Sequence, residues 1–452
     1  MLGLVLVITP AAEVGAAEHL RAEQLRVAAA VVEARLAAAS DEPDHRLAHV
    51  KVALATARRS LDGREPETLD TAAPEVRHAA ARLLRGLARA ELMRNRVEAA
   101  ESAVGRALRL APQDGVSLAV QAEVAVRGYA PRKAIAATTT ALHLRGEKAV
   151  TPVTRALVLR LRARALLMLE LVNEAAVAAA KASELVFADE EARALAAFAA
   201  RRRQLHLTEP RSRETSRHLI QTDLDDSFLR GAVSRILAIE PELQRLFPLP
   251  AGGRGAWRTR VVLLSAEAYD AVAPPNGAGA RAFYQRDSRA IYLDGANPER
   301  LRRLLAHEAC HAHLHRLLEE PPVWFDEGFA DYAAMLPVSR KAAWPDPHPI
   351  RSRDLCVLLF EGHDVRFREL SCLTREGLYR PGVLARYFPF CWGYMYFLRH
   401  GAGGTYRASL DRYSERVLVG ASPEEALATA FARTDLPELE ATFRVFVGTL
   451  SE

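Results

Sequence analysis

Apolar residues recur every three to four positions from about residue 16 to residue 205, and few glycines or prolines interrupt the pattern. This spacing is typical of amphipathic α-helices that bury one face. Breaks that contain proline or glycine divide the stretch into segments of about ten to twenty residues, the usual length of helices in globular proteins. The pattern therefore predicts an α-helical array of antiparallel helix pairs over residues 16–205.

One part of this array, residues 87–112, resembles a tetratricopeptide repeat. It has small residues where paired helices would touch, an Asn-Arg turn, and a proline after the second helix. Small residues recur at Ala100 and Ala134, and their separation along the chain equals the tetratricopeptide period. A further copy with a longer spacing is predicted over residues 166–189. A generic helical array is the alternative, and either form would present a concave surface for a peptide or a partner protein.

The pattern of apolar and polar residues changes after the array. A polar, proline-containing stretch at residues 206–215 predicts a linker between domains. After it come short alternating or apolar runs, which are typical of strands, and then helical patterns that continue to the C-terminus. This order predicts an α+β domain over residues 216–452, so the chain is expected to be multidomain.

The N-terminal residues 1–15 contain the longest apolar stretch of the chain. The stretch is too short to span a bilayer, so no stable membrane span is expected. It has the length of the apolar core of a signal peptide but lacks the positive charges that normally precede one. The protein is therefore expected to be cytoplasmic, or exported if these residues act as a signal segment.

The charge balance and the cysteines exclude some classes of function. The chain has 61 basic and 56 acidic residues, a formal net charge of +5. No basic tract resembling a DNA-binding arm accompanies this small excess, so no nucleic-acid partner is expected. None of the four cysteines belongs to a CxxC pair, which argues against a cysteine-ligated zinc site.

The residues most directly linked to chemistry lie in a helix expected at residues 298–318. It contains His307-Glu308-Ala-Cys-His311, an HExxH motif. Residues four apart lie on one face of a helix, so His307 and His311 can bind a single metal ion. Glu308 would lie beside a water in the open position of the metal and could act as its general base.

A second group of acidic residues follows the motif at a suitable distance. Glu327 belongs to the segment Val-Trp-Phe-Asp-Glu-Gly-Phe-Ala-Asp-Tyr332. The chain between His311 and Glu327 is long enough for a second helix to return and supply Glu327 as a third ligand, which completes a known catalytic zinc set. Asp331 lies one turn later on the same face and could accept the outer N–H of a ligand histidine. The sequence therefore predicts one Zn²⁺ per chain.

These two segments together resemble the gluzincin zinc peptidases, and specifically the peptidase MA-like domains of bacterial proteins. The resemblance covers about residues 217–450 and implies a zincin-type fold with His307, His311 and Glu327 as zinc ligands and Glu308 as general base. It also implies that a peptide substrate is held as an added strand along a sheet edge, for which residues 280–285 are the candidate.

The aminopeptidase relatives use a downstream tyrosine as a donor to the oxyanion. The corresponding region of this chain offers Tyr387 and Tyr394. Neither residue falls at the expected position when the segments are aligned. Both tyrosines are candidates, and Tyr387 is slightly preferred.

The sequence thus predicts a zinc metallopeptidase with helical repeats that bind a protein or peptide. One alternative is a non-catalytic, tetratricopeptide-like interaction protein with a degenerate zinc-binding domain. Another is hydrolysis of a non-peptide amide, which the same zinc chemistry permits.

Overall fold

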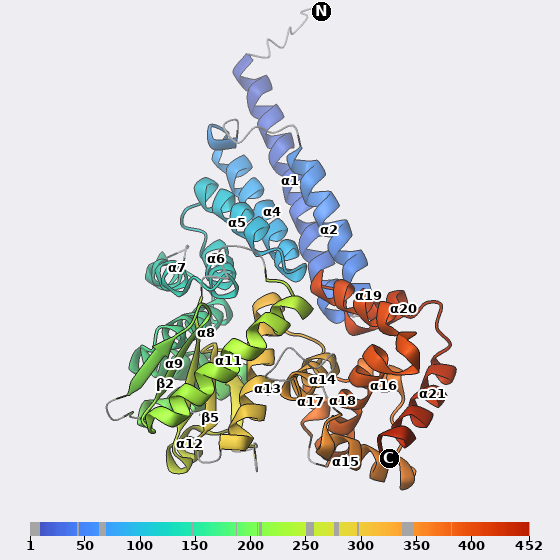
Figure 1. The fold of residues 1–452 in the computed structure, drawn as a ribbon. Helices are drawn as coiled ribbons and strands as arrows, with labels where there is room; N and C mark the ends of the chain where they lie inside the picture. Colours follow the sequence, from blue (N-terminus) through green and yellow to red (C-terminus); the bar gives the residue numbers. More distant parts are fainter. Residues whose placement is uncertain are drawn as a thin grey trace, which may run out of the picture. The chain divides into compact units, whose positions relative to one another are not determined.

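Helices make up most of the structure, and one small mixed sheet lies in the C-terminal part (Figure 1). This arrangement agrees with the predicted order of a helical array followed by an α+β part. The structure is a computed structural model. It describes residues 10–42, 45–62, 69–146, 149–186, 188–205, 207, 210–249, 257–274, 280–295, 298–336, 347–380 and 382–451.

The chain divides into two compact units, Met1–Arg162 and Ala163–Glu452. The division falls inside helix α8 and not at the linker expected over residues 206–215. That stretch includes strand β1, and the two helices that precede it belong to the second unit. Of the leader expected at residues 1–15, residues 1–9 lie outside the described residues and the remainder begins α1.

The first unit is a succession of helices in which neighbours along the chain pack together. Alanine, leucine and valine fill its core, and the many alanines allow the helices to approach closely. Within the described residues, its long helices are α1 (Pro10–Asp41), α2 (Arg46–Leu61), α4 (Pro74–Met93), α5 (Val97–Leu110), α6 (Gly115–Arg127), α7 (Pro131–His143) and α8 (Pro152–Met168), whose last residues enter the second unit.

Three helical hairpins share one type of turn. Asn95, Tyr129 and Glu170 each adopt a positive φ, at 56°, 58° and 60°. In each turn the next residue donates its backbone N–H to the carbonyl five positions before it, at 2.8–2.9 Å. The separation of Asn95 and Tyr129 along the chain equals the tetratricopeptide period, whereas Glu170 follows Tyr129 at a longer spacing. The structure therefore shows a repeated hairpin, and its identity as a tetratricopeptide repeat stays a prediction.

The second unit contains a five-stranded mixed sheet with the order β1-β2-β3-β5-β4. Strands β2, β3 and β5 are parallel, and the two edge strands β1 and β4 run antiparallel to their neighbours. The strands are β1 (Arg211–Glu214), β2 (His218–Thr222), β3 (Thr259–Leu264), β4 (Ala282–Gln285) and β5 (Ala290–Asp294).

Helices cover both faces of this sheet. Tyr292 of β5 packs against Phe198 of α10, and Phe283 of β4 packs against Tyr269 of α12. On the opposite face, Tyr284 of β4 contacts His315 of α13. The covering helices are α10 (Glu190–Gln204) and α12 (Ala266–Val272) on one face, and α11 (Asp226–Leu246) and α13 (Pro298–Leu317) on the other. The other helices of eight or more residues in this unit are α9 (Val172–Leu185), α14 (Val323–Ala334), α15 (Pro349–Phe360), α18 (Leu384–His400), α19 (Arg407–Leu418), α20 (Pro423–Ala430) and α21 (Leu436–Gly448).

Helix α14 lies between α13 and α18 and is buried along its whole length. The approach to α18 is close at Gly328, where a Cβ atom would lie 2.6 Å from the carbonyl oxygen of Cys391. Elsewhere α14 is held by aromatic packing, and the Trp324 indole donates a hydrogen bond to the Tyr413 hydroxyl at 2.9 Å. The packing of α14 therefore requires glycine next to Glu327.

None of the helices in the described part of the chain has the length and apolarity needed to cross a bilayer.

We expect Gly328→Ala to destabilise the second unit by about 1–3 kcal/mol, because the added methyl group would force α14 away from the α18 backbone. Calorimetry of thermal unfolding would measure the change. Gly231→Ala is the matched control, because an added Cβ there meets nothing within 4 Å on an exposed face of α11. That control should be neutral or stabilising by up to about 1 kcal/mol. Equal stability of the two variants would contradict the close packing described for Gly328.

Candidate metal centre

Two histidines and one glutamate converge where α13 packs against α14. His307 and His311 lie one turn apart on α13, and their Nε2 atoms are 3.1 Å apart. Glu327 of α14 places Oε2 3.6 Å from His307 Nε2 and 3.5 Å from His311 Nε2. A connecting loop separates Glu327 from His311 in the sequence, and the packing of the two helices brings the three groups together.

The spacing of these three atoms fits a tetrahedral metal site. Ligand atoms at about 2.0–2.1 Å from a zinc ion with tetrahedral angles lie roughly 3.3 Å from one another. The observed separations of 3.1, 3.5 and 3.6 Å are close to this value. Two imidazole nitrogens and a carboxylate oxygen also form a donor set that suits a borderline divalent cation. The three residues could therefore hold one metal ion.

Asp331 orients the first histidine. Its Oδ1 atom lies 3.0 Å from His307 Nδ1, and Arg351 donates a hydrogen bond to its Oδ2 atom at 2.6 Å. A carboxylate at Nδ1 favours the tautomer that leaves the Nε2 lone pair free for a metal. The structure therefore brings Asp331 to a position where it can fix the imidazole ring of His307.

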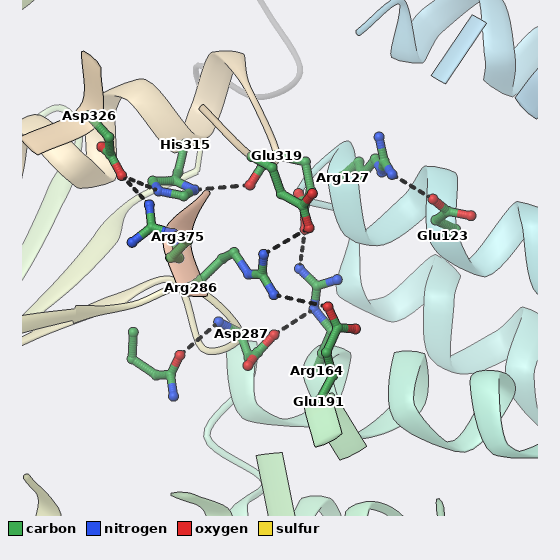
Figure 2. Close-up of polar contacts among 12 residues, drawn as sticks. Glu123, Arg127, Arg164, Glu191, Arg286, Asp287, His315, Glu319, Asp326 and Arg375 are labelled. Atoms are coloured by element: carbon green, nitrogen blue, oxygen red, sulfur yellow. Dashed lines mark hydrogen bonds and ion pairs between the residues drawn. The ribbon is translucent and has the colours of Figure 1, made fainter. Parts of the chain in front are cut away.

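Asp326 has the same relation to the second histidine, and the sequence analysis did not identify it. Its Oδ1 atom lies 2.6 Å from His311 Nδ1, and its Oδ2 atom accepts a hydrogen bond from Arg375 at 2.6 Å. His315 approaches the same carboxylate at 3.3 Å (Figure 2). Asp326 immediately precedes Glu327, so helical spacing alone gave no reason to place both side chains in one cluster.

Burial and charge oppose each other in this group. Burial by itself lowers the pKa of His307, but hydrogen bonds with Asp331 and Glu327 raise it to about 9. Burial would raise the pKa of Asp326, yet the neighbouring His311 and His315 hold it well below its usual range. The buried carboxylates are therefore ionised because cationic or hydrogen-bonding partners surround them.

Glu308 lies in the wall of the cavity that contains the metal-ligand group. The cavity has a volume of about 970 Å³, and strand β4 lines it together with Glu308 and the three ligand residues. Burial raises the pKa of Glu308 above its usual range, and the neighbouring His307 and His311, together with a backbone hydrogen bond from Tyr284 of β4, partly oppose this rise. The predicted segment 280–285 thus includes an edge strand that borders the cavity.

Neither predicted tyrosine is among the residues that line this cavity. The hydroxyl of Tyr387 on α18 donates a hydrogen bond to the Glu369 carboxylate, and the hydroxyl of the buried Tyr394 donates one to the carbonyl of Val365 at 3.0 Å. The structure therefore does not bring Tyr387 or Tyr394 to the metal-ligand group. Their helix is fixed by packing against α14, and that packing directs both hydroxyl groups elsewhere.

Tyr379 is the tyrosine that the structure places at the centre. It follows the short helix α17 (Arg375–Leu378), and its hydroxyl donates to Glu327 Oε1 at 2.5 Å. Desolvation of the hydroxyl beside the buried Glu327 carboxylate, and the negative charge of that carboxylate, raise the pKa of Tyr379 well above its usual range, so the hydroxyl keeps its proton. Its position depends on how a later part of the chain folds back onto Glu327, and no motif in the sequence indicates this.

An ion-pair network holds the C-terminal end of α13. The Glu319 carboxylate accepts a hydrogen bond from Arg164 at 2.5 Å and another from the buried Arg289 at 2.6 Å. Arg164 also contacts Asp287 at 3.0 Å, as Figure 2 shows. The carbonyl of Glu319 lies 3.1 Å from His315 Nδ1. The connection between α13 and α14, which sets the position of Glu327 relative to the histidines, is therefore anchored by charge.

Comparison with known proteins finds no family model that matches this chain and no similar sequence among proteins of curated function.

We expect the protein, purified without added metal or chelator, to contain about one zinc ion per chain. Glu327→Ala should abolish this content because it removes one of three ligands, and elemental analysis by mass spectrometry would measure it. Glu320→Ala is the matched control, since Glu320 is exposed and pairs only with Arg286 among the described residues. Absence of zinc from the unmodified chain, even after the metal is added, would contradict a metal centre.

Proposed function

We propose that this protein is a zinc-dependent peptidase of the gluzincin type with a peptidase MA-like catalytic domain. The observation that supports this most directly is the three-atom arrangement of His307, His311 and Glu327 beside Glu308 in a large cavity. Such a ligand set leaves a coordination position open for water or substrate. The function predicted from the sequence is thus the one that the geometry favours.

Each residue of the centre has a defined role in this proposal. A zinc ion bound by the three ligands would supply Lewis-acid activation of water and of the peptide carbonyl. Glu308 accepts the proton of the attacking water on its carboxylate and returns it to the leaving amine. Asp326 and Asp331 hold the two imidazole rings in the tautomer that presents Nε2.

The substrate is proposed to bind beside β4. This strand is at the edge of the sheet, so the outer backbone groups that Glu308 does not already bind can pair with an extended peptide. The repeated helical hairpins of the first unit are proposed to bind a protein or peptide partner, as helical arrays commonly do.

Glu308→Gln tests the catalytic part of this proposal. The variant should lose peptide hydrolysis by at least about a hundredfold, because the amide cannot accept the proton from water. Its zinc content should stay unchanged, because Glu308 is not a ligand. Hydrolysis of a mixed peptide library, followed by mass spectrometry, would provide the measurement, and Glu320→Gln is the matched control.

Full activity in Glu308→Gln would contradict the proposed mechanism. A zinc-loaded protein that cuts no peptide would favour one of the two alternatives: hydrolysis of a non-peptide amide, or a non-catalytic binding protein with a degenerate metal domain.

Tyr379 is proposed to donate a hydrogen bond to the carbonyl oxygen as negative charge develops on it. Its hydroxyl is protonated and already lies at the Glu327 carboxylate, at the border of the cavity. A preorganised donor of this kind contributes most when charge forms in the transition state.

We therefore expect Tyr379→Phe to lower kcat about 10²–10³-fold with a smaller effect on KM. Tyr387→Phe is the matched control on the tyrosine preferred from the sequence, and its steady-state kinetics should resemble those of the unmodified chain. A loss of kcat in the Tyr387 variant alone would instead restore the role predicted for Tyr387.

A further inference from the structure

The charges that line the metal cavity are strongly unbalanced. All four carboxylates of the lining, Glu308, Asp326, Glu327 and Asp331, belong to the metal centre described above. Seven arginines also line the cavity and leave an excess of three positive charges before any metal binds. They are Arg201, Arg281, Arg286, Arg300, Arg303, Arg351 and Arg375. The charge of the whole chain is nearly balanced, with 61 basic and 56 acidic residues. The cavity lining is therefore more positive than the chain as a whole.

Several of these arginines have structural partners. Arg351 and Arg375 hold the two aspartates of the metal centre. Arg281 pairs with Asp294 at 2.7 Å, and Arg286 pairs with Glu320 at 3.2 Å. These four guanidinium groups therefore stabilise the walls of the cavity, and part of their charge is neutralised.

Arg201 and Arg303 differ from this group because neither pairs with a carboxylate among the described residues. Both side chains line the cavity. A planar guanidinium group matches the geometry of a carboxylate, which can accept two of its N–H groups. As far as the described residues go, these two arginines can therefore bind an anionic ligand.

The positions of the two arginines border the place where a substrate would lie. Arg303 is four residues before His307 on α13, so both side chains lie on one face of the helix. Arg201 belongs to α10, which covers the opposite face of the sheet through Phe198 and Arg202. The two helices that carry these arginines therefore cover opposite faces of the sheet, and both arginines line the cavity.

We propose that the substrates are peptides with carboxylate groups close to the cleaved bond, and that Arg201 and Arg303 bind these carboxylates. This inference rests on the proposed peptidase function and adds the class of substrate. A cleft lined by charge of one sign attracts ligands of the opposite sign and strengthens their binding when water is excluded. The carboxylates could be Asp or Glu side chains or the C-terminal group of the peptide, since both present the same two oxygens.

Binding to the zinc-loaded full chain with Glu308→Gln tests the inference without cleavage. The probe is acetylated (Glu-Ala)₄ amide, to be compared with (Gln-Ala)₄ amide, each with an uncharged fluorophore, by fluorescence anisotropy. The Glu peptide should bind at least about tenfold more tightly, the change expected for a charge-assisted hydrogen bond. A third probe, (Gln-Ala)₄ with a free carboxyl terminus, shows whether a terminal carboxylate gives the same gain.

Matched variants separate specific binding from the general positive charge of the chain. Arg201→Gln and Arg303→Gln should each remove most of the preference for carboxylate. Arg203→Gln and Arg302→Gln remove the same charge from the same helices, but at exposed positions outside the cavity lining. These two control variants should keep the preference for carboxylate. Equal binding of all three probes, or equal losses in all four variants, would overturn the inference.

Cleavage of the same peptides by the chain with an intact Glu308 distinguishes this inference from the proposed function. A chain that cuts neutral and acidic peptides equally well keeps the peptidase proposal and overturns the acidic preference. A chain that binds the acidic probe through Arg201 and Arg303 but cuts none of the peptides supports the carboxylate site and overturns the peptidase proposal.

Discussion

Three ionised carboxylates are buried between α13 and α14, and the other parts of the centre are arranged to compensate them. Asp326, Glu327 and Asp331 are at most 4% exposed, and an isolated buried carboxylate would be protonated instead. Histidines of α13 and arginines from two later segments neutralise these charges at hydrogen-bonding distance. Loss of any one partner would leave a buried charge uncompensated and would destabilise the packing of the two helices.

This need for compensation explains why distant segments meet at one place. Arg351 lies on α15 and Arg375 on α17, and each contacts one of the aspartates that hold a ligand histidine. Gly328 permits the close approach of α18, whose aromatic residues form the core behind α14. The C-terminal helices thus support the centre from outside, although only a few of their residues border the cavity.

The last hairpin before the sheet also has a part in forming the cavity. Sequence periodicity assigns α9 and α10 to the helical array, yet their contacts assign them to the second unit. Arg202 of α10 donates a hydrogen bond to the Tyr292 hydroxyl of β5 and forms an ion pair with Glu170. Glu170 also forms an ion pair with Arg260 of β3. Charge and aromatic packing attach α10 to the sheet, and this attachment brings Phe198 and Arg201 to the cavity. A repeat-like hairpin has therefore become one wall of the proposed substrate site.

Local periodicity was enough to predict a large part of this architecture, whereas long-range packing places the remaining residues of the centre. The helical array, the order of sheet and helices, and the shared helical face of His307 and His311 all follow from spacing within one element. The convergence of Glu327 on these histidines was also predictable, because a short connection between two helices makes them neighbours. Tyr379, in contrast, reaches Glu327 from a distant part of the chain, and Asp326 pairs with His311 only through the relative rotation of two helices. No local pattern encodes such contacts, since they are selected by the simultaneous burial of apolar surface and pairing of charge across the whole unit.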